Sequence, residues 1–116
     1  MTPESLITDL HRAALRSARD DQTALTNVFT GRPARSLLNR VMREVGPMSE
    51  AAPAFPTAGG ARAPLKLKAE AAGASDFSSL WSGQAASLGC EIGCGDLTRQ
   101  LAEDAAQRLK ALASPS

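Results

Sequence analysis

The chain has 116 residues and a net charge of +1, and 43% of its residues are hydrophobic although only 3% are aromatic. This length allows one small domain, and the balanced charge excludes an overall field that would recruit nucleic acid or an anionic membrane. No apolar run is long enough to span a membrane and the first residues do not resemble a signal peptide, so we expect a cytoplasmic protein.

The first half predicts two helices separated by one strand. Thr2 as N-cap, Pro3 at the first helical position and a stripe of apolar residues predict a helix over 3–18. The β-branched and aromatic residues of 23–30 favour a strand, for which no pairing partner is evident. Over 34–45 the apolar positions recur at helical spacing, until Gly46 and Pro47 end the helix.

A long loop and three further helices are expected in the second half. Residues 48–63 are rich in proline, alanine and glycine, which is typical of a loop. Helices are predicted over 64–72, ended by Gly73, and over 76–88. The last helix begins with Asp96 as N-cap and ends at Ser114-Pro115. The whole chain is therefore expected to be one mainly α region, 1–116, with one short strand.

No catalytic motif stands out, and the groups that could carry chemistry each have a plainer interpretation. Four arginines could bind an anion, although a solvated helix face is the favoured explanation: Arg32, Arg35, Arg40 and Arg43. The segment 76–84 combines the one tryptophan with hydroxyls and an amide, which could stack on a planar ligand. The favoured explanation is that Phe77 and Trp81 anchor this helix in the core.

The one histidine and the two cysteines do not form a metal site by spacing. His11 has no carboxylate within helical reach, and we expect an uninvolved surface residue. Cys90 and Cys94 lack the further ligands that zinc requires, so reduced thiols are favoured over a disulfide, and a disulfide over a metal site.

Several motifs, in this order, resemble those of nitronate monooxygenases, also called 2-nitropropane dioxygenases. The most specific is Thr-Gly-Arg-Pro-Ala-Arg, which ends at Arg35, and the second is Leu-Trp-Ser-Gly-Gln, which ends at Gln84. Further matching segments are 2–4, 11–15, 23–29, 39–48, 52–56 and 97–99. The stretch from Cys90 to Gly95 is the least family-like.

The resemblance implies an FMN-dependent (β/α)8 barrel with a smaller helical substrate domain, which oxidises alkyl nitronates with O2 to a carbonyl compound and nitrite. Because such a barrel needs roughly 200 residues or more, this chain would correspond to a C-terminal fragment of it. The family's flavin-phosphate loops and catalytic histidine precede the matched region, and their roles do not pass to His11. We therefore expect no catalytic residue here, no bound FMN and no activity in this chain alone.

For an intact homologue, the resemblance implies that four residues line the flavin pocket: Trp81, Ser82, Gly83 and Gln84. Phe55 would lie near the substrate entrance, while Arg32 and Arg35 would hold their turn by hydrogen bonds to backbone carbonyls. The expected partner is the missing barrel half, or a second copy bound through apolar helix faces. The alternative is a small helical interaction module without catalysis.

Overall fold

A computed structural model describes residues 1–113 of the chain. These residues divide into two compact units, one formed by 1–6 with the chain from Cys90 onward, and the other by Ile7–Gly89. The predicted end of the last helix at Ser114-Pro115 lies outside the described residues. Among residues 1–113, no helix combines the length and apolarity that crossing a membrane requires.

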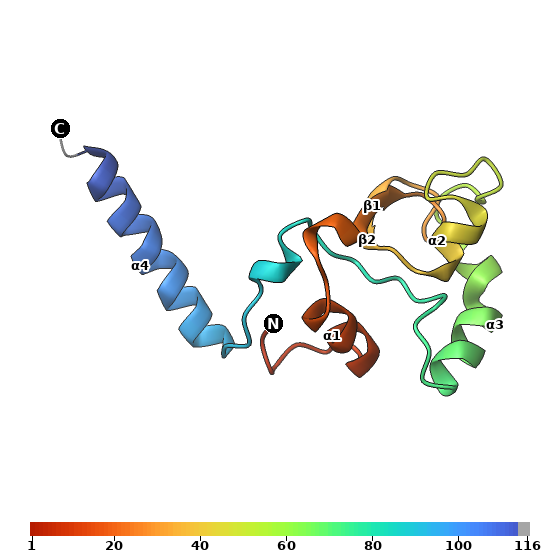
Figure 1. Cartoon of the computed structure of the whole chain (residues 1–116), viewed down its shortest axis with the longest axis horizontal. Coiled ribbons are helices and arrows are strands. Elements are labelled where there is room, and N and C mark those ends of the chain that lie inside the picture. Colours follow the sequence, from red (N-terminus) through yellow and green to blue (C-terminus); the bar gives the residue numbers. More distant parts are fainter. Residues whose placement is uncertain (114–116) are drawn as a thin grey trace. The chain divides into compact units, whose positions relative to one another are not determined.

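The first helix, α1, is Asp9–Arg16, shorter than the predicted 3–18 (Figure 1). Its N-cap is Thr8, whose side chain accepts a hydrogen bond from the His11 backbone, and Asp9 adds a favourable negative charge in the first turn. Thr2 does not cap a helix, since residues 1–8 are not helical, and Leu6, an early position of the expected apolar stripe, is fully exposed.

A β-hairpin replaces the expected unpaired strand and the first half of the following helix. Strand β1, Thr23–Thr26, pairs antiparallel with β2, Ala34–Leu37. The prediction of one strand without a partner was therefore wrong. Residues 34–37 form a strand rather than a helix because Ser36 and Leu37 are buried and hydrogen-bonded to the segment around Leu80.

The helix after the hairpin, α2, is Arg40–Val45, and its N-cap is Asn39. Its predicted end is confirmed, since Gly46 follows with a φ of 94°. Helix α3, Ala58–Ala71, begins well before the predicted position 64, so the loop ends at Thr57 rather than at 63. Burial of Ala58, which is 2% exposed, stabilises the helical turns that precede Pro64.

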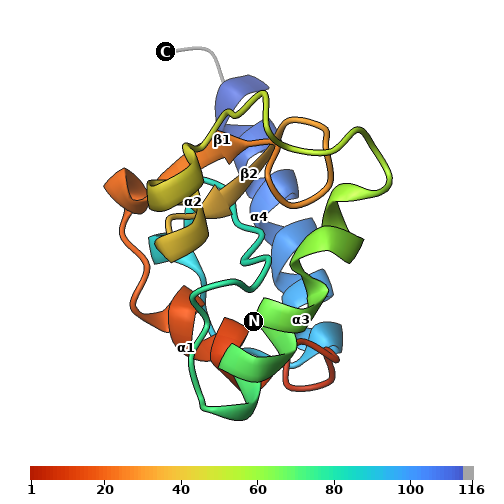
Figure 2. The same ribbon diagram turned by 90° about the vertical axis from the view of Figure 1, so that its right-hand side faces the viewer.

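Most of the segment predicted as a helix over 76–88 has no helical structure. It contains one short 3-10 helix, η2, at Ala86–Leu88, and Trp81 forms an antiparallel bridge with Ser36. Figures 1 and 2 show this segment running from the end of α3 past β2 toward α1. Pairing with β2 thus takes precedence over the local helical pattern, which Gly83 already weakens.

Two small clusters make the core of Ile7–Gly89. The first contains four buried residues, Val28, Phe29, Val41 and Met42, and the second contains Ala18, Leu37 and Leu80. Phe29 and Met42 are 1% and 0% exposed. Apart from Ala18, which follows α1, their members lie on the hairpin, on α2 and on the segment after α3, so the clusters fix that segment against β2.

In the other unit, α4 spans Cys94–Ala113 and starts two residues before the predicted N-cap Asp96. The Glu4 carboxylate accepts from the Cys94 backbone N–H at 3.3 Å, which supplies the helix with a negative charge at its N-terminus. None of the residues of α4 is buried.

Candidate functional site

The segment 75–82 is held by side chains from several elements. Asn39 donates to the carbonyls of Ser75 and Ser78 at 3.2 and 2.8 Å, while its own oxygen accepts from the first turn of α2. The Ser36 hydroxyl donates to the Leu80 carbonyl at 2.9 Å. Leu80 and Ser36 are buried, so these bonds lie in a protected environment.

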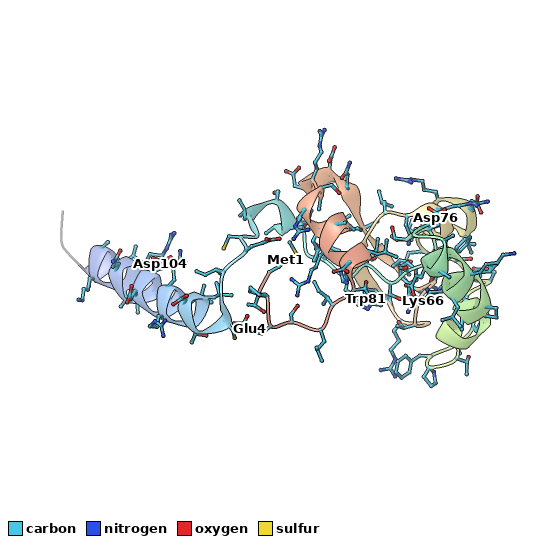
Figure 3. All side chains as sticks on the ribbon, turned by 90° about the horizontal axis from the view of Figure 1, so that it is seen from below. Met1, Glu4, Lys66, Asp76, Trp81 and Asp104 are labelled. Carbon is cyan, nitrogen blue, oxygen red and sulfur yellow. The ribbon has the colours of Figure 1, made fainter. Side chains whose placement is uncertain are left out.

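Trp81 is packed on one side and exposed on the other. Its ring meets the ring of Phe29 edge-to-face, with centroids 5.4 Å apart and an interplanar angle of 89°. The side chain remains 37% exposed, and Figure 3 labels it. Trp81 therefore packs on the core and still presents part of its indole to solvent.

His11 is not an uninvolved residue, which corrects the sequence-based expectation. Its Nε2 lies 3.0 Å from the Trp81 carbonyl oxygen. Because a carbonyl only accepts hydrogen bonds, the contact requires the proton on Nε2. The partner is 70 positions away in the sequence, so no helical spacing could have revealed it.

The three residues that follow Trp81 are mostly open. The Ser82 hydroxyl donates to the neighbouring Gly83 carbonyl at 3.0 Å, and a Cβ added at Gly83 would meet no atom within 4 Å. Gln84 is exposed. An indole, an amide and an open backbone position fit the approach of a planar ring system, which stacks on aromatic faces and takes hydrogen bonds at its edge.

The hairpin turn at Gly31 does not form a phosphate cradle. Gly31 has a φ of 86°, but the space of its missing Cβ is filled by the chain, since Phe55 N and Pro53 O would lie 2.4 and 2.5 Å away. The Gly31 turn therefore leaves no space for a phosphate group.

Arg32, Arg35 and Phe55 lie around the turn of the hairpin. The Arg32 guanidinium lies 4.3 Å from the centroid of the Phe55 ring, which is itself 51% exposed. Arg35 donates to the Thr23 hydroxyl across the hairpin at 3.1 Å. The expected bonds from these arginines to backbone carbonyls are thus replaced by a cation–π contact and a side-chain bond.

The other two arginines lie on α2. Arg40 pairs with Glu44 at 2.7 Å, as the i,i+4 spacing predicts, and this hydrogen bond and charge raise the pKa of Arg40. A cavity of about 410 Å³ includes Arg40 and Arg43 in its lining, together with Asp76. None of the five candidate residues at 55 and 81–84 lines it.

The cysteines are free and exposed, as the favoured interpretation has them. Among residues 1–113, no group of three or more His, Cys, Asp or Glu side chains gathers where it could hold a metal ion.

Comparison with known proteins shows the family to which the chain belongs. The family model described as nitronate monooxygenase matches residues 1–104, and the chain belongs to this family. It is 36% identical to a nitronate monooxygenase of Pseudomonas aeruginosa over 105 residues, which are 90% of this chain and 30% of that protein. It is 29% identical to a probable nitronate monooxygenase of Staphylococcus saprophyticus over 85 residues, 73% of this chain and 24% of that protein.

The fold is shared with a solved structure. A crystal structure of nitroalkane oxidase from Streptomyces ansochromogenes matches 97% of this chain with a TM-score of 0.83 and 39% identity. The match covers 32% of that protein, so the chain spans between about a quarter and a third of the length of these relatives. This is consistent with a fragment of the family fold that is mainly helical and has two strands.

Proposed function

We propose that this chain is the C-terminal part of an FMN-dependent nitronate monooxygenase with a (β/α)8 barrel, which oxidises alkyl nitronates with O2. The match to the Streptomyces nitroalkane oxidase over 97% of the chain is the observation that carries this proposal. When bound, FMN supplies the electron transfer between nitronate and O2. The activity is assigned to the intact polypeptide, since the relatives extend well beyond the matched third.

Within that polypeptide, Trp81 to Gln84 line the flavin ring and Phe55 lies near the substrate entrance. The partly exposed indole offers a face for stacking, and the open backbone at Gly83 lets a ring approach. We expect the chain alone to bind no FMN and to have no turnover, because it spans only about a third of the length of the Pseudomonas and Streptomyces proteins.

The partner of this chain is the remainder of the family polypeptide. Helix α4 has no buried residue, and its Leu101, Leu109 and Leu112 are 61%, 68% and 84% exposed. An apolar stripe of this kind requires a covering surface. The two thirds of the Streptomyces protein that lie outside the match supply a candidate for that surface. Self-association through α4 is the competing outcome.

A hybrid protein tests the assignment of the flavin-lining residues. In it, this chain replaces the 105 matching residues of the Pseudomonas nitronate monooxygenase. We expect Trp81→Ala and Gln84→Ala to weaken FMN binding by about tenfold, the equivalent of about 1.4 kcal/mol, with Lys68→Ala on exposed α3 as the matched control. Unchanged FMN affinity in both variants would rule out the assigned contacts.

Sedimentation of this chain alone measures its oligomeric state and so tests whether α4 binds the remainder of the polypeptide or a second copy of the chain. Replacement of Leu101 and Leu109 by Gln should lower FMN retention in the hybrid and leave this chain a monomer. A stable dimer of the unaltered chain that the two replacements dissociate would favour self-association instead.

A further inference from the structure

Arg62 is a partly buried cation on α3 that contacts the segment leading to Trp81. Its Nη1 donates to the Phe77 carbonyl, and its Nη2 donates to the Ser79 hydroxyl at 2.9 Å. One guanidinium group thus fixes two points of the chain, two and four residues before Trp81. The planar geometry of arginine allows this, because its donors lie in a fixed fork.

The same guanidinium also covers the ring on which Trp81 rests. Its Cζ lies 4.7 Å from the centroid of the Phe29 ring, and the edge-to-face contact of Phe29 with Trp81 involves that ring as well. Arg62 therefore reaches Trp81 by two routes, through the backbone of 77–79 and through Phe29.

This arrangement is costly in itself. The Nε of Arg62 is buried without a hydrogen-bond acceptor among the described residues, and burial lowers the pKa of the guanidinium, which the charge of Glu70 partly offsets. A buried donor without an acceptor costs more free energy than a typical exposed contact returns. The contacts of Arg62 with residues 77–79 and with Phe29 offset the cost of the unpaired donor. They can form only while the segment 77–79 stays in this position.

A second anchor lies beyond Arg62 along the same segment. The His11 side chain of α1 donates from Nε2 to the Trp81 carbonyl at 3.0 Å. Arg62 and His11 thus hold the segment before Trp81 and at Trp81 itself. They come from helices that are far apart in the sequence, so the segment is fixed by tertiary contacts and not by a secondary structure of its own.

We propose that Arg62 is a positioning residue that fixes the orientation of Trp81 and of the three residues after it, with His11 as the second anchor. The consequence for catalysis rests on the proposed function, in which this segment lines the flavin ring. The positioning itself belongs to this chain and is measurable without flavin.

The tryptophan makes the test specific. The chain contains one Trp and no Tyr, so its tryptophan fluorescence reports on position 81 alone. Arg62→Met keeps the apolar volume and removes both donors. Ser79→Ala removes one acceptor without disturbing the core. Lys68→Met, on the exposed face of the same helix, is the matched control.

Acrylamide quenching of Trp81 and far-UV circular dichroism are measured for each variant. At 37% exposure the indole is partly shielded, so a released segment raises the quenching constant by up to about threefold in Arg62→Met. Ser79→Ala gives a smaller rise in the same direction, and Lys68→Met gives none. The dichroism of all three stays that of the unaltered chain.

Unchanged quenching in Arg62→Met with retained dichroism would overturn the proposal. If Arg62→Met unfolds, Ser79→Ala decides, because raised quenching in a folded Ser79→Ala supports positioning and unchanged quenching refutes it. In the hybrid protein, Trp81→Ala without effect on FMN would refute the flavin contact and leave the quenching result intact. The two proposals therefore fail separately.

Discussion

A position can require glycine because its φ is positive or because a Cβ would not fit, and three glycines of this chain allow the two reasons to be tested separately. Gly31 has a φ of 86°, and an added Cβ would lie 2.4 to 2.7 Å from the backbone of 53–55. Gly73 has a φ of 77° but open space around it, while Gly60, inside α3, has neither constraint. Alanine should therefore cause both backbone strain and a steric clash at position 31. It should cause backbone strain alone at position 73, and neither at position 60.

The left-handed backbone costs a non-glycine residue about 1–2 kcal/mol, and forcing a methyl group against packed atoms adds about 1–3 kcal/mol. Gly31→Ala should therefore lower the free energy of unfolding by about 2–5 kcal/mol, and Gly73→Ala by about 1–2 kcal/mol. Gly60→Ala should raise it by about 0.5–1 kcal/mol, since alanine favours a helix interior. Because Phe55 contributes to the close approach, Gly31→Ala also displaces the residue assigned to the substrate entrance.

Urea denaturation followed by far-UV circular dichroism measures the series. With a slope of about 1–3 kcal/mol per molar urea, Gly31→Ala should shift the midpoint down by about 1 M or more. If Gly31→Ala and Gly73→Ala have the same midpoint, the chain at 53–55 does not press on Gly31, and the described path of the loop is wrong.

Three further variants test the contacts around the segment 75–82 and the surface. Asn39→Ala removes the cap of α2 and leaves two backbone carbonyls without their donor, so it should cost about 2–4 kcal/mol in the same assay; a loss under about 0.5 kcal/mol would contradict the described bonds. Glu44→Ala should leave the urea midpoint unchanged within the error of the measurement, because the side chains of Arg40 and Glu44 are 55% and 56% exposed; a clear shift would show that the pair is shielded from water. Cys90 and Cys94 are exposed and free, so both thiols should react with a disulfide reagent in the native protein; protection of either one would contradict their exposure.

Local signals in the sequence predicted the points where helices end. Gly46 and Gly73 adopt positive φ after α2 and α3, at the positions that their place in the pattern indicates. The backbone freedom of glycine acts over one or two residues, so it is readable without tertiary structure. The family, too, follows from short motifs, and the comparisons confirm it.

The features that could not be predicted from the sequence depend on contacts between residues that are distant in the chain. Residues 34–37 have apolar positions that fit the start of a helix, yet β2 forms because it pairs with β1 on one side and meets Trp81 on the other. The roles of His11 and Arg62 depend on partners that lie 70 and 15 or more positions away. Periodicity carries no information about such pairs.

The flavin content of the hybrid protein tests the central claim most directly. The account predicts that this chain alone purifies without FMN, and that the hybrid, in which it replaces the matching part of the Pseudomonas enzyme, purifies with stoichiometric FMN and consumes O2 with an alkyl nitronate. A folded hybrid without flavin, or stoichiometric FMN on this chain alone, would contradict it.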